Sequence, residues 1–365
     1  MSSEVTKSLA DIFKDALNEV NGHDEKSIKE NMDEICNMLE KEILSSDSDM
    51  ECKQEMLKKL RKFCNTQTNI MLVGATGCGK SSTINALFNC SNMDEDGTIE
   101  VAKVGSKCDP ETKDIEKYTI GNLVLWDTPG LGDGTEIDEH HKEVITELLR
   151  EEDEDGNALI DLVLVVLDGS TRDLGTSYII LNEVIIPELG EDTDRILVAL
   201  NQADIAMKTG RHWNYEANEP DEALVQFLEE KVDSIKTRIK EDSELEVSPV
   251  YYCAGYQEDN GDVVCPYNLS KLLYYILNAI PSHKRVAIIE NINTDSENYE
   301  HDDEDMDYGE EIKEVFVDSF DYFISEGVDT GAEIGGAILG LPGALVGAFL
   351  GGAVGCIRSI LDDIF

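Results

Sequence analysis

The sequence predicts an α/β fold in which helices flank a mostly parallel β-sheet. Three continuous apolar runs have the length and composition of strands buried on both faces, as strands of a parallel sheet are. Segments of helical character follow these runs, and a glycine-rich turn joins the first run to its helix. The predicted strands are 70–73, 115–120, 123–126, 162–167, 195–200 and 248–253, and the predicted helices are 82–89, 138–152, 178–189, 222–239 and 269–280.

The glycine-rich turn at 74–81 reads GATGCGKS and matches the phosphate-binding pattern G-x-x-x-x-G-K-[ST], with a strand before it and a helix after it. Glycine lets the main chain approach phosphate oxygens, and N–H groups at a helix N-terminus attract an anion. In this pattern Lys80 reaches the β- and γ-phosphates and the Ser81 hydroxyl is placed for Mg²⁺. The expected nucleotide-binding residues here are Gly74, Ala75, Thr76, Gly77, Cys78, Gly79, Lys80, Ser81 and Ser82.

A D-x-x-G motif at 127–130 follows the predicted strand 123–126. The short carboxylate of Asp127 can hold Mg²⁺ through water, because Mg²⁺ prefers oxygen ligands and keeps several waters. The Gly130 N–H can contact a γ-phosphate with no side chain in the way. The motif is weak alone, but its position after the phosphate-binding loop predicts a metal and γ-phosphate site.

An N-x-x-D motif at 201–204 follows the strand 195–200. The Asp204 carboxylate can accept hydrogen bonds from N1–H and the 2-amino group of guanine, a donor pair that adenine lacks. Gln202 replaces the usual lysine, which we expect to loosen stacking on the base, while Asn201 and Asp204 keep the main contacts. Cys253 and Ala254 follow the last strand, where main-chain N–H groups commonly support the guanine carbonyl.

Taken in order, GATGCGKSSTINALF, WDTPGLGDG, NQAD and YYCAG resemble the Era-like branch of the TRAFAC GTPases, in particular small bacterial proteins of the ribosome-binding GTPase type. The likeness covers about residues 66–282. It implies a G domain that binds GTP with Mg²⁺ and hydrolyses it to GDP. It also implies that Thr112 is the switch-I threonine over Mg²⁺ and the γ-phosphate, with Thr98 as a second candidate. Lys80, Thr112 and Gly130 are then the expected catalytic residues.

Two departures from related GTPases predict slow intrinsic hydrolysis. Leu131 stands where Ras-like enzymes carry a water-orienting glutamine, and Gly77 stands where some Era-like relatives carry an asparagine that holds potassium. The expected transition-state stabilisation comes from Lys80, Mg²⁺ and main-chain N–H groups. A partner, or a second copy of the chain, would complete the site.

Three nearby side chains allow a second interpretation. We expect His140 and His141 to be exposed residues on a solvated helix; the alternative is a role in positioning water. We expect Cys78 to be a small side chain that fills space in the phosphate-binding loop; the alternative is a thiol that makes nucleotide binding sensitive to oxidation.

Composition limits the expected binding partners and the expected cellular compartment of the protein. The net charge of −47 over 365 residues argues against general nucleic-acid binding, because phosphate backbones would be repelled. Nine cysteines without metal-ligand spacing favour a reduced, cytoplasmic compartment. The first residues lack the basic and apolar pattern of a secretion signal.

Four segments are expected: an N-terminal helical region (1–65), the G domain (66–282), an acidic linker (283–311) and a C-terminal helix with a glycine-zipper-like tail (312–365). The linker holds ten acidic residues and no Lys or Arg over 295–311, typical of a solvated, disordered connection, with a docking segment for a basic partner as the alternative. Within 331–360 glycines recur four apart, and Pro342 interrupts an uncharged run. Membrane contact, self-association and packing on the G domain all remain open for this tail.

These features favour a GTP-hydrolysing molecular switch with an unidentified protein effector. The alternative is a GTP-dependent assembly or membrane-associated protein, a homo-oligomer in which the tail mediates the contact. A nucleotide-binding protein without turnover is the third possibility, because of Leu131.

Overall fold

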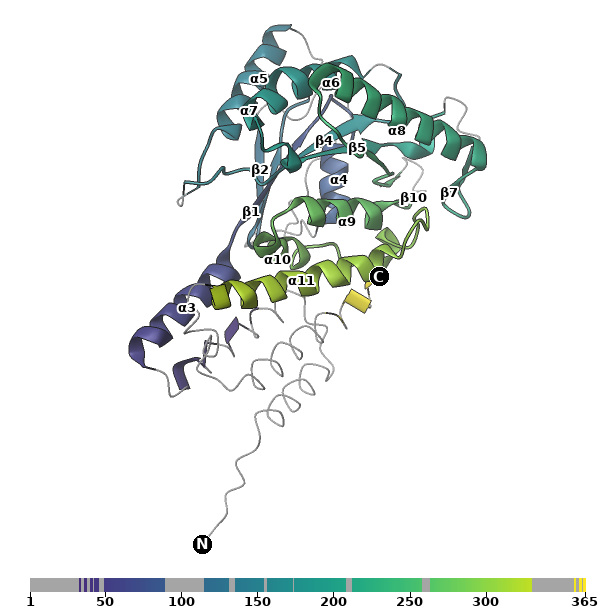
Figure 1. Ribbon diagram of the computed structural model, residues 1–365. Helices are drawn as coiled ribbons and strands as arrows, with labels where there is room; N and C mark the ends of the chain where they lie inside the picture. Colours follow the sequence, from purple (N-terminus) through teal and green to yellow (C-terminus); the bar gives the residue numbers. More distant parts are fainter. Residues whose placement is uncertain are drawn as a thin grey trace, which may run out of the picture. The chain divides into compact units, whose positions relative to one another are not determined.

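The computed structural model describes residues 49–88, 115–130, 135–153, 156–172, 174–207, 212–257 and 263–329, together with 33, 36–37, 40–41, 43–45, 358, 361–362 and 364–365 (Figure 1). The chain divides into two compact units. The sheet unit comprises Gln67–Pro281 and Ile292–Tyr308. The helical unit comprises Met1–Thr66, Ser282–Asn291 and Gly309–Phe365.

A six-stranded sheet forms the centre of the sheet unit, in the order β2-β3-β1-β4-β5-β8. Only the edge strand β2 runs antiparallel, because it forms a hairpin with β3 through Gly121 and Asn122. The other neighbouring pairs are parallel. The strands are β1 (Thr68–Val73), β2 (Glu116–Ile120), β3 (Leu123–Asp127), β4 (Leu162–Asp168), β5 (Ile196–Asn201) and β8 (Val250–Tyr251). The α/β prediction is therefore confirmed, with the last strand shorter than expected.

Helices cover both faces of this sheet, with α5, α6 and α8 on one face and α4 and α9 on the other (Figure 1). Every residue of β1 and β5 is buried, as expected for central strands, whereas residues of the edge strand β2 alternate between partly buried and exposed. The helices are α4 (Lys80–Leu87), α5 (Thr135–Leu149), α6 (Gly175–Ile180), α7 (Ile186–Leu189), α8 (Glu222–Ser243) and α9 (Leu269–Ala279), with a π-helical turn at Leu181–Ile185 between α6 and α7.

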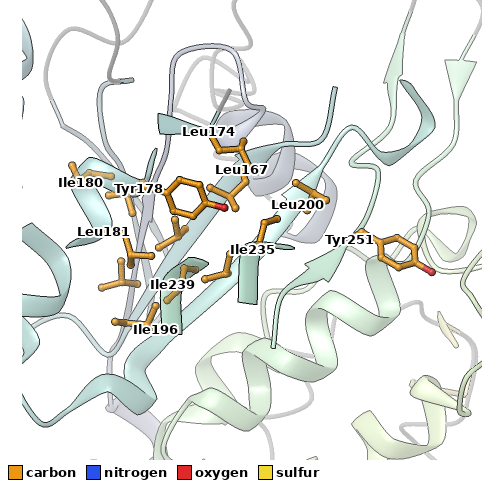
Figure 2. Close-up of a cluster of buried hydrophobic side chains, with 14 of the residues drawn as sticks. Leu167, Leu174, Tyr178, Ile180, Leu181, Ile196, Leu200, Ile235, Ile239 and Tyr251 are labelled. Carbon is orange, nitrogen blue, oxygen red and sulfur yellow. The ribbon is translucent and has the colours of Figure 1, made fainter. Parts of the chain in front are cut away.

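An apolar core lies between the sheet and the helices α5, α6 and α8. Alternate residues of the central strands point into it, because successive side chains of a strand face opposite sides. Leu167 and Leu200 of the sheet meet Ile235 and Ile239 of α8, beside Tyr178 of α6 (Figure 2). The side chain of Asp221 accepts a hydrogen bond of 2.9 Å from Leu224 N and so caps the start of α8.

Short elements complete the sheet unit at its loops. Two small antiparallel ribbons are formed by β6 (Trp213–Asn214) with β7 (Glu219–Pro220), and by β9 (Tyr256–Gln257) with β10 (Val263–Val264). Single 3₁₀ turns lie at Thr193–Arg195, Ala203–Ile205 and Ser296–Asn298.

The helical unit contains α3 (Met50–Asn65), α10 (Arg285–Ile289) and most of α11 (Tyr308–Asp329). Cys36 and Cys64 form a disulfide in it, which differs from the free thiols expected of a reduced compartment. At the other end of the chain, Lys313 of α11 binds Asp362 at 2.6 Å, and Arg358 binds Glu310 at 2.7 Å. These pairs hold the last residues on the first turns of α11.

The segment 292–308 differs most from its prediction. It is packed on the sheet unit instead of being a solvated, disordered linker. Its acidic side chains can be ordered because some of them have partners, such as the pair between Asp303 and Lys271 at 2.5 Å. The loop with Thr98 and Thr112, Leu131 and the tail 331–357 lie outside the described residues. No helix of the described part is long and apolar enough to cross a membrane.

A core substitution in β5 tests this packing. Leu200 is fully buried, so we expect Leu200→Ala to lower the free energy of unfolding by about 2–5 kcal/mol, through lost transfer energy and the cavity left behind. The control is Ile179→Ala on α6, where the side chain is 45% exposed and the change should stay within about 0.5 kcal/mol. Urea denaturation measures both; equal losses would contradict the assigned core.

Candidate nucleotide-binding site

The motif residues meet at one edge of the sheet. Because β1, β3, β4, β5 and β8 are parallel, their carboxyl ends share an edge, where open α/β sheets bind ligands. The register pairs Leu72 with Asp127 and Asp168 with Asn201 at these ends. The sheet therefore brings together the phosphate-binding loop, the D-x-x-G motif and the N-x-x-D motif.

The phosphate-binding loop lies between β1 and α4 and packs tightly on its neighbours. Gly79 has φ +92°, and a Cβ there would lie 2.1 Å from the Asn201 Nδ2. A Cβ at Gly74 would lie 2.2 Å from the Val166 carbonyl oxygen. Helix α4 starts at Lys80, whose Nζ donates to the Gly74 carbonyl at 3.3 Å. The loop thus places a buried cation and a helix N-terminus at one point, which favours binding of a phosphate chain.

Ser81 and Asp127, two of the predicted metal ligands, lie in direct contact. The Ser81 hydroxyl donates to Asp127 Oδ2 at 2.6 Å, and Asp127 Oδ1 is buried with no hydrogen-bond partner among the described residues. Burial raises the pKa of the Asp127 carboxyl, while Lys80 and the Ser81 hydrogen bond oppose the rise. A hydroxyl beside a carboxylate with an unpaired oxygen fits the oxygen-ligand preference of Mg²⁺.

Gly130 lies directly against the phosphate-binding loop. A Cβ on this residue would lie 2.3 Å from Thr76 Oγ1 and 2.6 Å from Thr76 N. Thr128 anchors the motif, since its N–H and its hydroxyl both donate to the Leu72 carbonyl, at 3.2 and 2.8 Å. The main chain of the D-x-x-G motif is therefore held beside the loop that would carry the phosphates.

Asn201 joins the two predicted halves of the site. Its Nδ2 donates to the Cys78 carbonyl at 3.0 Å, and its Oδ1 accepts from Ala254 N at 3.0 Å. Gln202 adds a second tie, because its Nε2 donates to the Gly77 carbonyl at 2.9 Å. Beyond the weakened stacking predicted for it, Gln202 therefore also holds the phosphate-binding loop. The Ala254 N–H that was expected to face the guanine carbonyl is engaged with Asn201.

Asp204 is buried beside these residues. It is 2% exposed, and its Oδ2 has no hydrogen-bond partner in the described part of the chain. Burial raises the pKa of its carboxyl, and a hydrogen bond from Cys253 together with nearby main-chain N–H groups offsets part of the rise. An unpaired buried carboxylate oxygen at this edge fits a base that offers two N–H donors.

Two contacts at the site could not be read from the motifs. Tyr252, which is fully buried, shares a hydrogen bond of 2.6 Å with the Thr83 hydroxyl of α4. Lys231 of α8 donates to the carbonyls of Gly169 and Thr171, in the loop after β4. Burial lowers the pKa of Lys231. Neither residue belongs to a recognisable pattern, because its partners lie on distant elements.

The predictions for His140, His141 and Cys78 have different outcomes in the structure. His140 is exposed, as expected, but the same expectation is wrong for His141, which is 4% exposed. His141 lies one helical turn before the buried Ile145 and so belongs to the inner face of α5. Cys78 is fully buried, which raises the pKa of its thiol and keeps it protonated. This favours the filler interpretation over an oxidation-sensitive thiol.

Comparison with known proteins agrees with this geometry. Residues 69–202 match the family model described as 50S ribosome-binding GTPase. The chain contains a P-loop GTPase domain. The match covers less than half of the chain, so it assigns this domain and not the remaining segments. No curated protein matches the chain.

Several solved structures resemble the chain distantly. Toc33 from Arabidopsis thaliana in complex with GDP and Mg²⁺ has 18% identity, with 68% of this chain and 97% of that chain covered and a TM-score of 0.39. A probable GTP-binding protein EngB has 19% identity, 58% and 98% coverage and a TM-score of 0.32. An oligomerised bacterial dynamin pair has 15% identity, 84% and 49% coverage and a TM-score of 0.41. These likenesses are too distant to assign a function.

The buried Asp204 carboxylate should cost stability in the nucleotide-free protein. Because burial raises its folded-state pKa above the ordinary value of 3.8, the folded state binds the proton more tightly than the unfolded state. This contribution is fully present below the ordinary value and is lost as the pH rises through the folded-state pKa. We expect Asp204→Asn to raise the free energy of unfolding by about 1 kcal/mol at pH 7, with the gain over the wild type shrinking toward pH 4.

Chemical denaturation of the nucleotide-free proteins at several pH values between 4 and 8 measures this difference. Asp233→Asn on α8 is the control, because that carboxylate is 78% exposed and its loss should leave the pH dependence unchanged. A destabilised Asp204→Asn at pH 7 would contradict the electrostatic account.

Proposed function

We propose that this protein is a molecular switch that binds GTP with Mg²⁺ and hydrolyses it to GDP and phosphate at a low intrinsic rate. The observation that carries the proposal is the pair of Asn201 contacts. They fix the phosphate-binding loop and the loop 251–254 to one side chain, three residues before the unpaired Asp204 carboxylate. These contacts support the proposal that one site binds both the phosphates and the guanine base.

Different residues bind different parts of the substrate. Lys80 and the main-chain N–H groups of 74–81 bind the phosphates, and Asp204 selects guanine over adenine. Ser81, Asp127 and Thr112 would hold Mg²⁺, which when bound neutralises charge on the phosphate oxygens. Gly130 contributes its N–H at the γ-phosphate. Thr112 enters this assignment through the family resemblance alone.

Hydrolysis is the step that the domain leaves incomplete. Leu131 has no group that can orient water, and Gly77 has no side chain for a potassium ion. Transition-state stabilisation therefore falls to Lys80, Mg²⁺ and the main-chain N–H groups. We infer that an effector, or a second copy of the chain, supplies the missing group. We also propose that the protein acts in the cytoplasm and belongs to an Era-like subclass of the GTPases.

A second candidate is GTP-dependent self-assembly or membrane association through residues 331–360. The sequence supports it, because glycines recur four apart in a run that carries no charge from 334 to 357. In this reading the nucleotide controls the contact made by the tail.

Base recognition tests the switch proposal directly. We expect Asp204→Asn to weaken GTP binding about a hundredfold and to admit xanthosine triphosphate, because a carbonyl and an amide then face a base with the complementary groups. Titration calorimetry with both nucleotides measures it. Lys80→Ala is the control, since it should remove binding of both. Unchanged GTP affinity in Asp204→Asn would sink the guanine assignment.

Dependence on protein concentration separates the two candidates. For a simple switch, the GTPase rate per molecule stays constant as concentration rises and as liposomes are added. For the assembly reading, the rate rises steeply, and a chain ending before Gly331 loses the rise.

Truncation before Gly331 also removes the ion pair between Arg358 and Glu310. It also removes the pair between Lys313 and Asp362, so the matched control is the full-length double variant Arg358→Ala with Asp362→Asn, which breaks both pairs and keeps the tail. A flat rate in every chain supports the switch, and a rise that the truncated chain retains excludes the tail as its cause.

A further inference from the structure

The acidic segment 292–308 contacts the carboxyl end of α4 at its first end. Ile292 forms an antiparallel bridge with Phe88, and Asn293 N donates to the Leu87 carbonyl at 2.8 Å. The Tyr299 hydroxyl donates to the same carbonyl at 3.3 Å. Leu87 is the last residue of α4, the helix that begins at Lys80. The segment thus satisfies the carboxyl end of the helix whose amino end binds phosphate.

At its second end the segment is clamped through Asp303. The Asp303 Oδ2 binds Lys271 Nζ of α9 at 2.5 Å, and the two side chains are only 10% and 14% exposed. Asp303 N also donates to Asn268 Oδ1 at 2.8 Å, and Tyr308 donates to Asp303 Oδ1 at 3.0 Å. Removing one partner of such a largely buried pair leaves the other charge uncompensated, which is costly.

Asn268 carries this clamp to the loop 251–254. It is fully buried, and its Nδ2 donates to the Tyr251 carbonyl at 3.1 Å as well as to Asp303. The preceding residue, Tyr267, exchanges two main-chain hydrogen bonds of 3.0 Å with Cys253. The next residue along, Ala254, donates to Asn201. Asn268, Tyr267, Cys253 and Ala254 therefore connect Asp303 to Asn201, the side chain that joins the two halves of the site.

We propose that residues 292–308 act as a brace that positions the loop 251–254 against the phosphate-binding loop, with Asp303 as its positioning residue. The inference rests on the proposed GTP function. The brace spans from the end of α4 to the start of α9, so it connects the element that carries Lys80 with the elements that carry Cys253 and Ala254. Its partners are internal, chiefly Lys271 and Asn268, so Asp303 is already neutralised within the chain.

The brace has a predictable effect on nucleotide selection. Contacts to the phosphates do not depend on which base is attached, whereas contacts on the guanine side do. Loosening Asp303 should weaken GTP more than ATP, so the ratio of the two affinities falls. A general loss of folded protein would weaken both nucleotides equally and leave the ratio unchanged.

The test compares Asp303→Asn with Asp305→Asn. Asp305 binds the same Lys271 at 3.0 Å, but its side chain is 69% exposed, so its loss should change little. In nucleotide-free protein, we expect Asp303→Asn to speed hydrogen exchange at the amides of Tyr252, Cys253 and Ala254 about tenfold, and the ratio of GTP to ATP affinity to fall about tenfold, the scale of a lost charged hydrogen bond. Asp305→Asn should match the wild type in both measurements.

Unchanged amide exchange in Asp303→Asn, or equal weakening of GTP and ATP, would overturn the brace. If the wild-type chain does not bind GTP, the proposed function fails, while the exchange comparison still decides the brace. Where Asp303→Asn does not fold, Tyr308→Phe takes its place, because it removes a single hydrogen bond to Asp303. We then expect the same pattern at about two- to threefold.

Discussion

The amide of Asn201 is the interaction on which the nucleotide site depends. It donates to Cys78 and accepts from Ala254, so it needs a donor and an acceptor on one planar group. Aspartate would place a negative oxygen against the Cys78 carbonyl, and leucine would leave a buried carbonyl and a buried N–H without partners. Two glycines make room for it: a Cβ at Gly79 would lie 2.1 Å from its Nδ2, and one at Gly169 would lie 2.4 Å from its carbonyl oxygen. The site is therefore built around this residue as much as around the phosphate-binding loop.

The same packing explains why two charged side chains at the site reduce the stability of the folded protein. Asp127 and Asp204 are almost completely buried, each has an oxygen without a partner among the described residues, and burial raises the pKa of both. A protein selected only for stability would not keep two such carboxylates. Each unpaired oxygen fits the ligand proposed for it, a divalent cation for Asp127 and a pair of N–H donors for Asp204. Stability and binding are opposed at the same two residues.

Local patterns were enough to predict the central strands and the motif residues, because each depends on neighbouring positions. The run at 162–167 reads as a buried strand, and Lys80, Asp127 and Asn201 follow strands as their motifs require. Long-range partners carried no such signal. Tyr252 meets Thr83, which lies 169 positions earlier, and His141 is buried because of its place on α5. The order of the acidic segment could not be predicted for the same reason, since its composition is typical of disorder and its partner Lys271 lies on a distant element.

That segment shows how a chain with 77 acidic and 30 basic residues can order its acidic parts. Net repulsion disfavours compaction, so the few cations matter most where they are shielded from water and screened little by salt. Lys271 and Lys313 have side chains 14% and 7% exposed, and each binds two carboxylates. Lys271 fixes the acidic segment on α9, and Lys313 fixes the last residues of the chain on α11. Because α11 begins where the acidic segment ends, these two lysines fix consecutive stretches of the chain, and the placement of a few cations decides which acidic stretches become part of the fold.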